Sequence, residues 1–195
     1  RTMDGQRLNI STVEDPVEYE LAFCNQVNVL EKIGMTFPAA LRSLLRQDPD
    51  VVMLGEIRDE ETARIAVQAA LTGHLVLSTL HTNDAPSSIT RMINIGIEPY
   101  LISAAVNTVL AQRLVRRICE HCRRQATTMP DAVLLEAYGV PPESVCEGAG
   151  CDHCRHTGYA GRLGIYELLT INDTLRDLVT SNPSLTELRR YCHTA

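Results

Sequence analysis

The sequence predicts an α/β fold: a parallel sheet with helices on both faces, followed by a small cysteine-rich lobe and a C-terminal helical segment. The first observation is that short apolar runs without alternation, typical of strands covered on both faces, recur along the first half of the chain. The second is that helical segments separate these runs, as in βαβ units. The third is a pair of CxxC motifs between the α/β part and a helical tail.

The central run of the predicted sheet is Val51–Leu54. The turn-forming residues Asp48–Asp50 precede it, and Gly55 and Glu56 follow it. Ligands of open α/β sheets bind beyond the carboxyl ends of the strands. An acid at this point, after a glycine that lets backbone approach closely, suits a site for Mg²⁺ and phosphate. The alternative is a strand that ends in a charged turn, since short motifs also arise by chance.

Two further strands are predicted, and both end in polar residues. Leu8–Val13 runs into the acidic segment Glu14–Glu18, where Pro16 ends the strand because it lacks a backbone donor. His74–Leu80 is followed by His81. Taken singly, each strand end is also consistent with a solvated turn. In a parallel sheet, however, the carboxyl ends lie at one edge, so we expect the polar residues there to converge: Glu14, Asp15, Glu18, Glu56 and His81.

Helices are predicted between and after these strands. Thr36 is suited to cap the first, while the acids Asp59–Glu61 at the start and Gly73 beyond the end are typical of the second. The predicted helices of the α/β part are Phe37–Gln47, Asp59–Leu71, Pro86–Asn94 and Pro99–Arg117. Farther along we expect a short helix over Pro130–Tyr138, a strand over Tyr159–Leu169, and helices from Asn172 to Ser181 and from Leu185 onward.

The composition excludes several classes of protein. The chain of 195 residues is 45% hydrophobic, which suffices for one ordinary domain and a small appendage. The net charge of −6 argues against a general nucleic-acid binder. The longest mostly apolar run, Tyr100–Ala111, is too short and too polar to span a bilayer. An odd number of cysteines, 7, without an export signal favours metal or thiol chemistry over a disulfide framework.

Four of the cysteines have the spacing of a zinc site. Two residues between paired cysteines let both thiolates reach one ion, and two such pairs complete a tetrahedral site. The pairs are Cys119 with Cys122 and Cys151 with Cys154. Redox chemistry at a CxxC motif and plain buried cysteines are the alternatives. His121, His153 and Cys146 lie nearby as possible substitute ligands, but the symmetric set of four needs none of them.

Several segments resemble motifs of the ATPases that power type II secretion and type IV pilus assembly. Thr12–Tyr19 resembles the Asp box of that family, and Arg46–Ala63 resembles its Walker B region. Thr72–Ala85 resembles its His box. Ala111–Cys119, together with the two CxxC pairs, resembles its tetracysteine metal domain, which fits the assembly and secretion branch because retraction members generally lack it. The similarity covers nearly the whole chain in the family's order.

This resemblance implies a RecA-like ATPase that works as a homo-hexamer with ATP, Mg²⁺ and Zn²⁺. It implies a cytoplasmic protein, peripheral at the inner membrane, that binds the platform protein of a secretion or pilus machine and no nucleic acid. We expect the domain organisation to be a C-terminal part of a RecA-like domain over residues 1–117, a tetracysteine zinc lobe over 118–160, and a strand with a truncated helical tail over 161–195.

The resemblance also implies roles for the residues at the strand ends. Glu56 acts on Mg²⁺ directly or through water, and His81 senses the γ-phosphate or couples to a neighbouring subunit. Arg58 pairs with one of the acids, the alternative being that it only caps the following helix. Glu14 and Asp15 orient the magnesium shell. For the catalytic base, Glu18 is favoured over Glu14, because a residue beyond the Pro16 turn can project back over the nucleotide.

One departure from the family pattern bears on activity. No P-loop of the GxxxxGK[ST] type precedes the Asp box, and we interpret the chain as a fragment that we expect not to hydrolyse ATP alone. The competing hypothesis is a non-catalytic module in which the zinc lobe is a docking surface and the α/β part its scaffold. A zinc-ribbon nucleic-acid binder is disfavoured by the net charge and by the lack of interleaved aromatic and basic residues.

Overall fold

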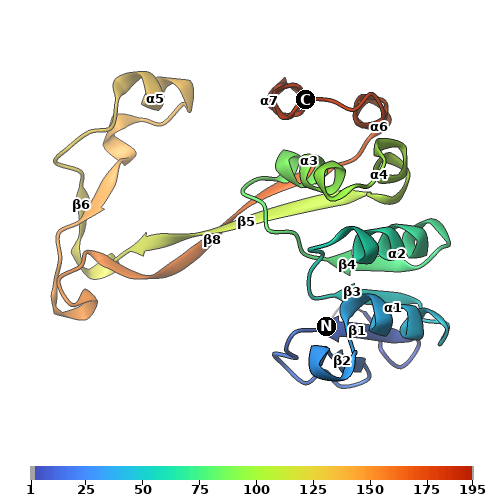
Figure 1. Cartoon of the computed structure of the whole chain (residues 1–195). Coiled ribbons are helices and arrows are strands. Elements are labelled where there is room, and N and C mark those ends of the chain that lie inside the picture. The colour runs from blue at the N-terminus through green and yellow to red at the C-terminus, as the bar shows by residue number, and fades with distance from the viewer. Residues whose placement is uncertain (1–2, 195) are drawn as a thin grey trace. The chain divides into compact units, whose positions relative to one another are not determined.

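The computed structural model describes residues 3–194 and divides the chain into two compact units (Figure 1). The first unit contains the chain up to Ala111 together with the part from Glu167 onward. The second unit is Gln112–Tyr166. Within residues 3–194, none of the helices combines the length and the apolar character that a membrane span requires.

The first unit is built on a parallel sheet of four strands in the order β2-β1-β3-β4. The strands are β1 (Ile10–Glu14), β2 (Asn25–Asn28), β3 (Val51–Leu54) and β4 (Leu75–Ser78). Val13 lies opposite Leu54, and Leu54 lies opposite Ser78. The residues that follow β1, β3 and β4 therefore meet at one edge of the sheet, as the sequence predicts.

The helices of this unit begin where capping residues predict. They are α1 (Phe37–Leu45), α2 (Glu60–Leu71), α3 (Ala85–Ile95) and α4 (Pro99–Ala105), with a short 3₁₀ turn, η1 (Glu31–Ile33), before α1. Thr36, Asp59 and Asp84 each accept a hydrogen bond from a backbone N–H in the first turn of α1, α2 and α3. Gly73, just past α2, has a φ of +103°, which an L side chain rarely adopts.

The core of the unit lies between the sheet and the helices α1 and α2. Val13, Val52 and Leu54 are fully buried and belong to one apolar cluster with residues of both helices: Ala40, Leu41, Leu44, Ala63, Ala66 and Val67. On the other face of the sheet, Leu75 and Leu77 of β4 are exposed. Side chains alternate between the faces of a strand, so Val76 packs against the cluster while its neighbours do not.

The predicted helix over Pro99–Arg117 is wrong beyond its first turns. Helix α4 ends at Ala105, Val106 is extended, and β5 (Thr108–Ile118) follows. Strand β5 pairs with β8 (Tyr159–Thr170) in a two-stranded sheet. Leu, Ala, Gln and Arg favour helix in isolation, but the ladder with a strand about 50 residues later overrides that weak preference. The strand predicted over Tyr159–Leu169 is confirmed.

The chain returns to the first unit at Glu167 in β8, and two C-terminal helices follow, α6 (Asp173–Thr180) and α7 (Leu185–Thr194). Asn172 caps α6, as predicted. Ser184 and Glu187 form a capping box at the start of α7, because Ser184 donates to the Glu187 carboxylate and accepts from its backbone N–H. Leu175, Val179 and Leu188 are fully buried in the core, so both helices are fixed by packing.

The second unit contains little regular structure. Its elements between β5 and β8 are η2 (Glu120–Cys122), β6 (Arg123–Gln125), α5 (Ala132–Ala137), η3 (Pro142–Ser144), β7 (Cys146–Gly148) and η4 (Asp152–Cys154). Strands β6 and β7 are antiparallel, with Arg123 opposite Gly148 and Gln125 opposite Cys146. This pairing brings both CxxC motifs to the same end of a short hairpin.

Candidate active site and metal centre

A cavity of about 190 Å³ lies at the carboxyl ends of β1 and β3. Its lining includes four of the five acids and histidines that the sequence predicts to converge: Glu14, Asp15, Glu18 and Glu56. Pro16, Phe37, Met53 and Gly55 complete the wall. The structure therefore brings the carboxylates of two separate motifs around one space, as expected for a site that binds a cation between them.

Gly55 connects the two acidic segments through its backbone. Its N–H donates to Val13 O at 2.8 Å. A Cβ at this position would lie 3.4 Å from Val13 O and 3.5 Å from the Cα of Glu14, which are ordinary contact distances. The backbone hydrogen bond of Gly55 therefore keeps the turn that carries Glu56 close to the end of β1.

Glu14 is the buried member of the acidic group, with a relative exposure of 9%. Its Oε1 accepts hydrogen bonds from Thr12 Oγ1 at 2.6 Å and from Gln26 Nε2 at 2.9 Å. Burial by itself would raise the pKa of Glu14, but these two bonds and one from the backbone of Glu18 hold the pKa below its usual value. Glu14 is therefore a fixed anion, while Asp15 and Glu18 are exposed at the rim.

Glu56 is joined to the two other residues that the sequence singles out. Its Oε1 forms an ion pair with Arg58, and its Oε2 lies 2.9 Å from His81 Nε2. The Glu56 side chain is 11% exposed, whereas that of His81 is 80% exposed. The hydrogen bond from Arg58 lowers the pKa of Glu56, and burial opposes this effect. His81 thus contacts the acid and does not line the cavity itself.

The sequence does not identify the partners of Glu14. Thr12 lies in β1 and Gln26 in β2, and they are opposite one another in the parallel ladder, on the face that carries Glu14. The polar composition of Asn25–Asn28 gives no indication of a strand, so only the structure shows that Gln26 supports the site.

The four predicted metal ligands form one cluster in the second unit. The Sγ atoms of Cys119, Cys122, Cys151 and Cys154 all lie within 4.8 Å of one another. The Sγ–Sγ distances are 3.9 Å for Cys119–Cys151 and 3.8 Å for Cys122–Cys154. A tetrahedral zinc site with metal–sulfur bonds of about 2.3 Å has edges of about 3.8 Å, so the thiols fit such an ion. A disulfide, with sulfurs about 2.05 Å apart, does not match these distances.

Backbone donors around the cluster prepare it for a cation. Burial raises the pKa of the Cys154 thiol, but the N–H groups of Cys151 and Gly158 donate to its Sγ at 3.2 and 3.3 Å and bring the pKa down to about 6. Burial and the neighbouring thiols raise the pKa of Cys122 to about 12. A bound cation favours the thiolate form of all four ligands and removes this difference.

The backbone of Gly158 lies beside the cysteine cluster in a conformation and at a distance that require glycine. Its φ is +76°, and a Cβ added to it would meet Gly148 O at 2.5 Å. The backbone of the two glycines therefore packs directly together, and only glycine allows Gly158 N–H to reach Cys154.

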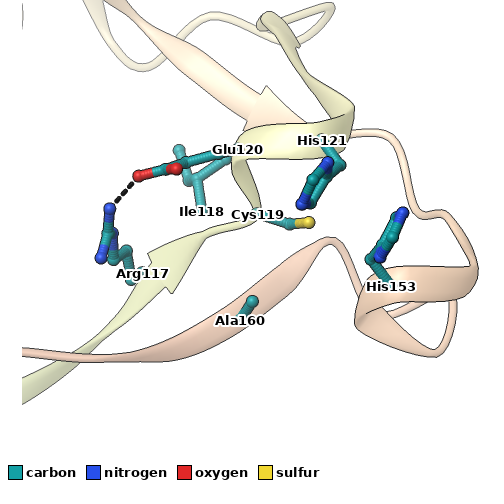
Figure 2. A pocket seen from close by; sticks show the side chains of 7 residues that line it. All are labelled: Arg117, Ile118, Cys119, Glu120, His121, His153 and Ala160. Carbon is teal, nitrogen blue, oxygen red and sulfur yellow. Dashed lines mark hydrogen bonds and ion pairs between the residues drawn. The ribbon is translucent and has the colours of Figure 1, made fainter.

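His121 and His153, the residues inside the two CxxC motifs, stack on each other. Their ring centroids are 4.0 Å apart, with planes inclined by 19°. Figure 2 shows the rings facing each other beside Cys119, in a pocket of about 290 Å³ that also includes the ion pair of Arg117 with Glu120. Among the described residues, the group whose ligand atoms lie close enough to hold one metal ion consists of the four cysteines, and His121 and His153 lie outside it.

Comparison with known proteins decides the family. Over residues 1–195 the chain matches the profile of the family described as Type II/IV secretion system protein. The chain belongs to this family. It is 51% identical over 194 residues to the type IV pilus assembly ATPase PilB of Myxococcus xanthus, with 97% of this chain and 34% of the relative covered. It is 49% identical over 195 residues to type II secretion system protein E of Pseudomonas aeruginosa, with 100% and 39% covered. The resemblance inferred from the motifs is confirmed.

Two solved structures have the same fold as this chain. The crystal structure of the pilus retraction motor PilT with bound ADP superposes with a TM-score of 0.67 at 30% identity, covering 96% of this chain and 45% of that one. The ATPase DotB of Legionella pneumophila, at 21% identity and a TM-score of 0.63, matches in fold. The predicted α/β fold class is therefore confirmed. The chain spans about a fifth to two fifths of the length of the curated relatives that it matches.

Replacing Glu14 by Gln tests the buried carboxylate. Because the folded pKa lies below the unfolded value of about 4.3, the charge stabilises the fold fully above that pH and loses its effect as pH falls through the folded pKa. We expect Glu14→Gln to lower the free energy of unfolding by about 1.5–3 kcal/mol at pH 7, the usual scale for hydrogen bonds to a charged group. The loss should be smaller in acid. Urea unfolding from pH 7 to pH 3 measures this, with exposed Glu20→Gln as control. If the stability difference between the wild type and Glu14→Gln grows as the pH falls, Glu14 is not a stabilising anion.

The cysteine cluster predicts one zinc ion per chain. Metal analysis of protein purified without added zinc should give a ratio near one, and Cys119→Ser/Cys151→Ser should lose the metal. Binding to structural sites of this kind is worth about 10–16 kcal/mol, so chelation should unfold the second unit and spare the parallel sheet. Cys146→Ser is the matched control, because its Sγ donates to Ser144 O and lies outside the cluster. A ratio near zero, or metal retained by the double variant, refutes the site.

Proposed function

We propose that this chain is part of an ATP-hydrolysing motor subunit that powers pilus or pseudopilus assembly for type IV pili or type II secretion. Relatives at about half identity are named as pilus assembly ATPases and type II secretion proteins. The observation that carries the proposal is the convergence of Glu14, Asp15, Glu18 and Glu56 on one cavity at the carboxyl edge of a parallel sheet. A non-catalytic scaffold does not need such a gathering of like charges, which costs energy without a cation.

In this proposal each acid has a separate role in phosphoryl transfer. Glu56 holds Mg²⁺ directly or through water, and Glu14 and Asp15 orient the magnesium shell. Mg²⁺, when bound with ATP, neutralises charge that develops on the phosphates. Arg58 and His81 both contact Glu56, so they set the direction of its carboxylate and connect it to the region of the γ-phosphate.

Two features support Glu18 over Glu14 as the catalytic base. A base must accept a proton from water and so needs a free lone pair and access to the nucleotide. Glu14 is buried, accepts hydrogen bonds from Thr12 and Gln26, and has a lowered pKa, so it is a weak base. Glu18 lines the same cavity and is exposed.

Turnover by the full-length protein tests these roles. Glu18→Gln should lower kcat by about 10²–10⁴-fold, the usual contribution of a general base, with nearly unchanged nucleotide affinity. Glu56→Gln should also lower kcat, but with an altered dependence on Mg²⁺ concentration. Phosphate release and nucleotide binding are measured on each variant, with Glu20→Gln as a surface control. If Glu14→Gln is more damaging than Glu18→Gln while the fold is intact, the roles are exchanged.

The zinc lobe supplies the docking surface in this proposal. The motor assembles as a homo-hexamer, cytoplasmic and peripheral at the inner membrane, and the platform protein binds the lobe that Zn²⁺ holds together. Helix α5 supports this assignment because its Val133 and Leu134 and the C-cap residue Tyr138 are all exposed. On a helical wheel these side chains form one arc with Glu136 at one border, and Asp131 caps the start of the helix. An apolar strip bordered by acids suits a basic amphipathic segment of a protein partner.

Removal of the α5 segment, residues 126–145 of the lobe, tests docking separately from catalysis. Gln125 lies opposite Cys146 in the β6–β7 ladder, so residues 126–145 can be replaced by a two-residue Asn-Gly turn without separating the CxxC motifs. In the full-length protein this change should leave basal ATPase activity intact and abolish stimulation by the purified platform protein. Leu134→Ser/Tyr138→Ser should act similarly, and Ile33→Ser, an exposed apolar residue of the other unit, is the control. Unchanged stimulation speaks against docking at this lobe.

A further inference from the structure

The loop that carries His81 joins β4 to α3 and is fixed at its first end to the segment of Glu56. Thr79 Oγ1 donates to Gly55 O at 2.6 Å, and Ile57 N donates to Thr79 O at 3.1 Å. Between these bonds and the start of α3, His81 is 80% exposed. Packing therefore contributes little to the position of the imidazole, and the anchors of the loop decide it.

The second end of the loop is held from two distant elements. Asp84 caps α3 by accepting from Ser87 N at 2.8 Å, and its other oxygen accepts from Arg189 Nη2 at 2.6 Å. The next residue, Ala85, is fully buried and its N–H donates to Glu167 Oε2 of β8 at 2.9 Å. One side chain, Arg189, thus links the last helix of the chain to a point three residues beyond His81.

Helix α7, which carries Arg189, is held in place by packing and by hydrogen bonds. It packs against α3, and Leu188, the neighbour of Arg189, is fully buried. Tyr191 Oη donates to Asn172 Oδ1 at 2.9 Å, and the capping box of Ser184 and Glu187 fixes the first turn. The Arg189 and Asp84 side chains are 49% and 26% exposed, so the ion pair sits at the surface but is anchored on both sides.

We propose that Arg189 is a positioning residue: by holding Asp84, it couples the docking of helix α7 to the placement of His81 against Glu56. A movement of α7 away from α3 would release one oxygen of the Asp84 carboxylate and loosen the second end of the loop, which the bonds of Asp84 to Ser87 and of Ala85 to Glu167 still hold. Because His81 is exposed and lies on this loop, its contact with Glu56 is the part of the site that depends most on how the Asp84 end of the loop is held. The catalytic consequence rests on the proposed function, whereas the structural coupling does not.

Two single substitutions remove the ion pair while sparing the fold. Arg189→Gln deletes the charge on α7. Asp84→Asn keeps an oxygen that caps α3, since Asn and Asp are similarly good N-caps, but it loses the carboxylate. Arg190→Gln is the matched control, because it is the adjacent arginine of the same helix and lies near Glu187.

Hydrogen exchange in the full-length protein measures the coupling directly. Either substitution should speed exchange of amides in residues 79–85 by about 1.5- to 5-fold, the range expected from an exposed ion pair, and the double variant should add nothing. Exchange in α2 and in the Arg190→Gln control should not change. Unchanged exchange in the loop, or additive effects in the double variant, overturns the proposal.

Turnover separates this inference from the proposed function. We expect kcat for ATP to fall by a similar factor in Arg189→Gln and Asp84→Asn, with KM unchanged and with partial recovery in Arg189→Lys. A merely structural role would instead lower the fraction of folded protein without this pattern. Faster exchange with an unchanged kcat would confirm the positioning by Arg189 and overturn the catalytic role of His81 instead.

Discussion

The candidate site depends on the register of the parallel sheet. Val13, Leu54 and Ser78 lie side by side, so the residues that follow them form one edge although they come from three distant segments. Side chains alternate along a strand, and a slip of one residue would turn Glu14 toward the helices and Val13 toward the cavity. The burial of Val13, Val52 and Leu54 beneath α1 and α2 opposes that slip. The hydrophobic core thus fixes the position of the carboxylates.

The second unit is stabilised in a different way, because its apolar core is too small to specify its fold. Within Gln112–Tyr166, the buried residues of the structure include Cys119 and Cys154, both members of the cysteine cluster. Exposed apolar residues such as Val133 and Tyr138 do not contribute to a core. A tetrahedral ion bound by the two CxxC motifs would supply the missing free energy. The apolar side chains Val133 and Leu134 of α5 would then stay exposed, as the proposed docking surface requires.

The sequence predicts those parts of the structure that depend on local chemistry. Caps at Thr36 and Asn172, the buried strand Val51–Leu54 and the paired cysteines each follow from short-range rules. Strand β5 is wrongly assigned as helix because its sequence lacks strict alternation and its partner β8 lies far along the chain. Partners such as Gln26 for Glu14 and Arg189 for Asp84 are equally long-range, and a lone polar residue in the sequence carries no indication of its contact.

The charge balance of the cavity limits how a nucleotide can bind there. Four carboxylates line it, and none of the described residues in its lining is Lys or Arg. Arg58 forms an ion pair with Glu56 and partly neutralises it, and His81 contacts the same carboxylate. A triphosphate entering this space would be repelled unless a divalent cation lies between it and the acids, and unless cationic or backbone donors from outside the lining hold its other face. In the proposed function, this lining therefore suits the magnesium and water side of phosphoryl transfer, and the groups that hold the phosphates lie outside the lining of the cavity.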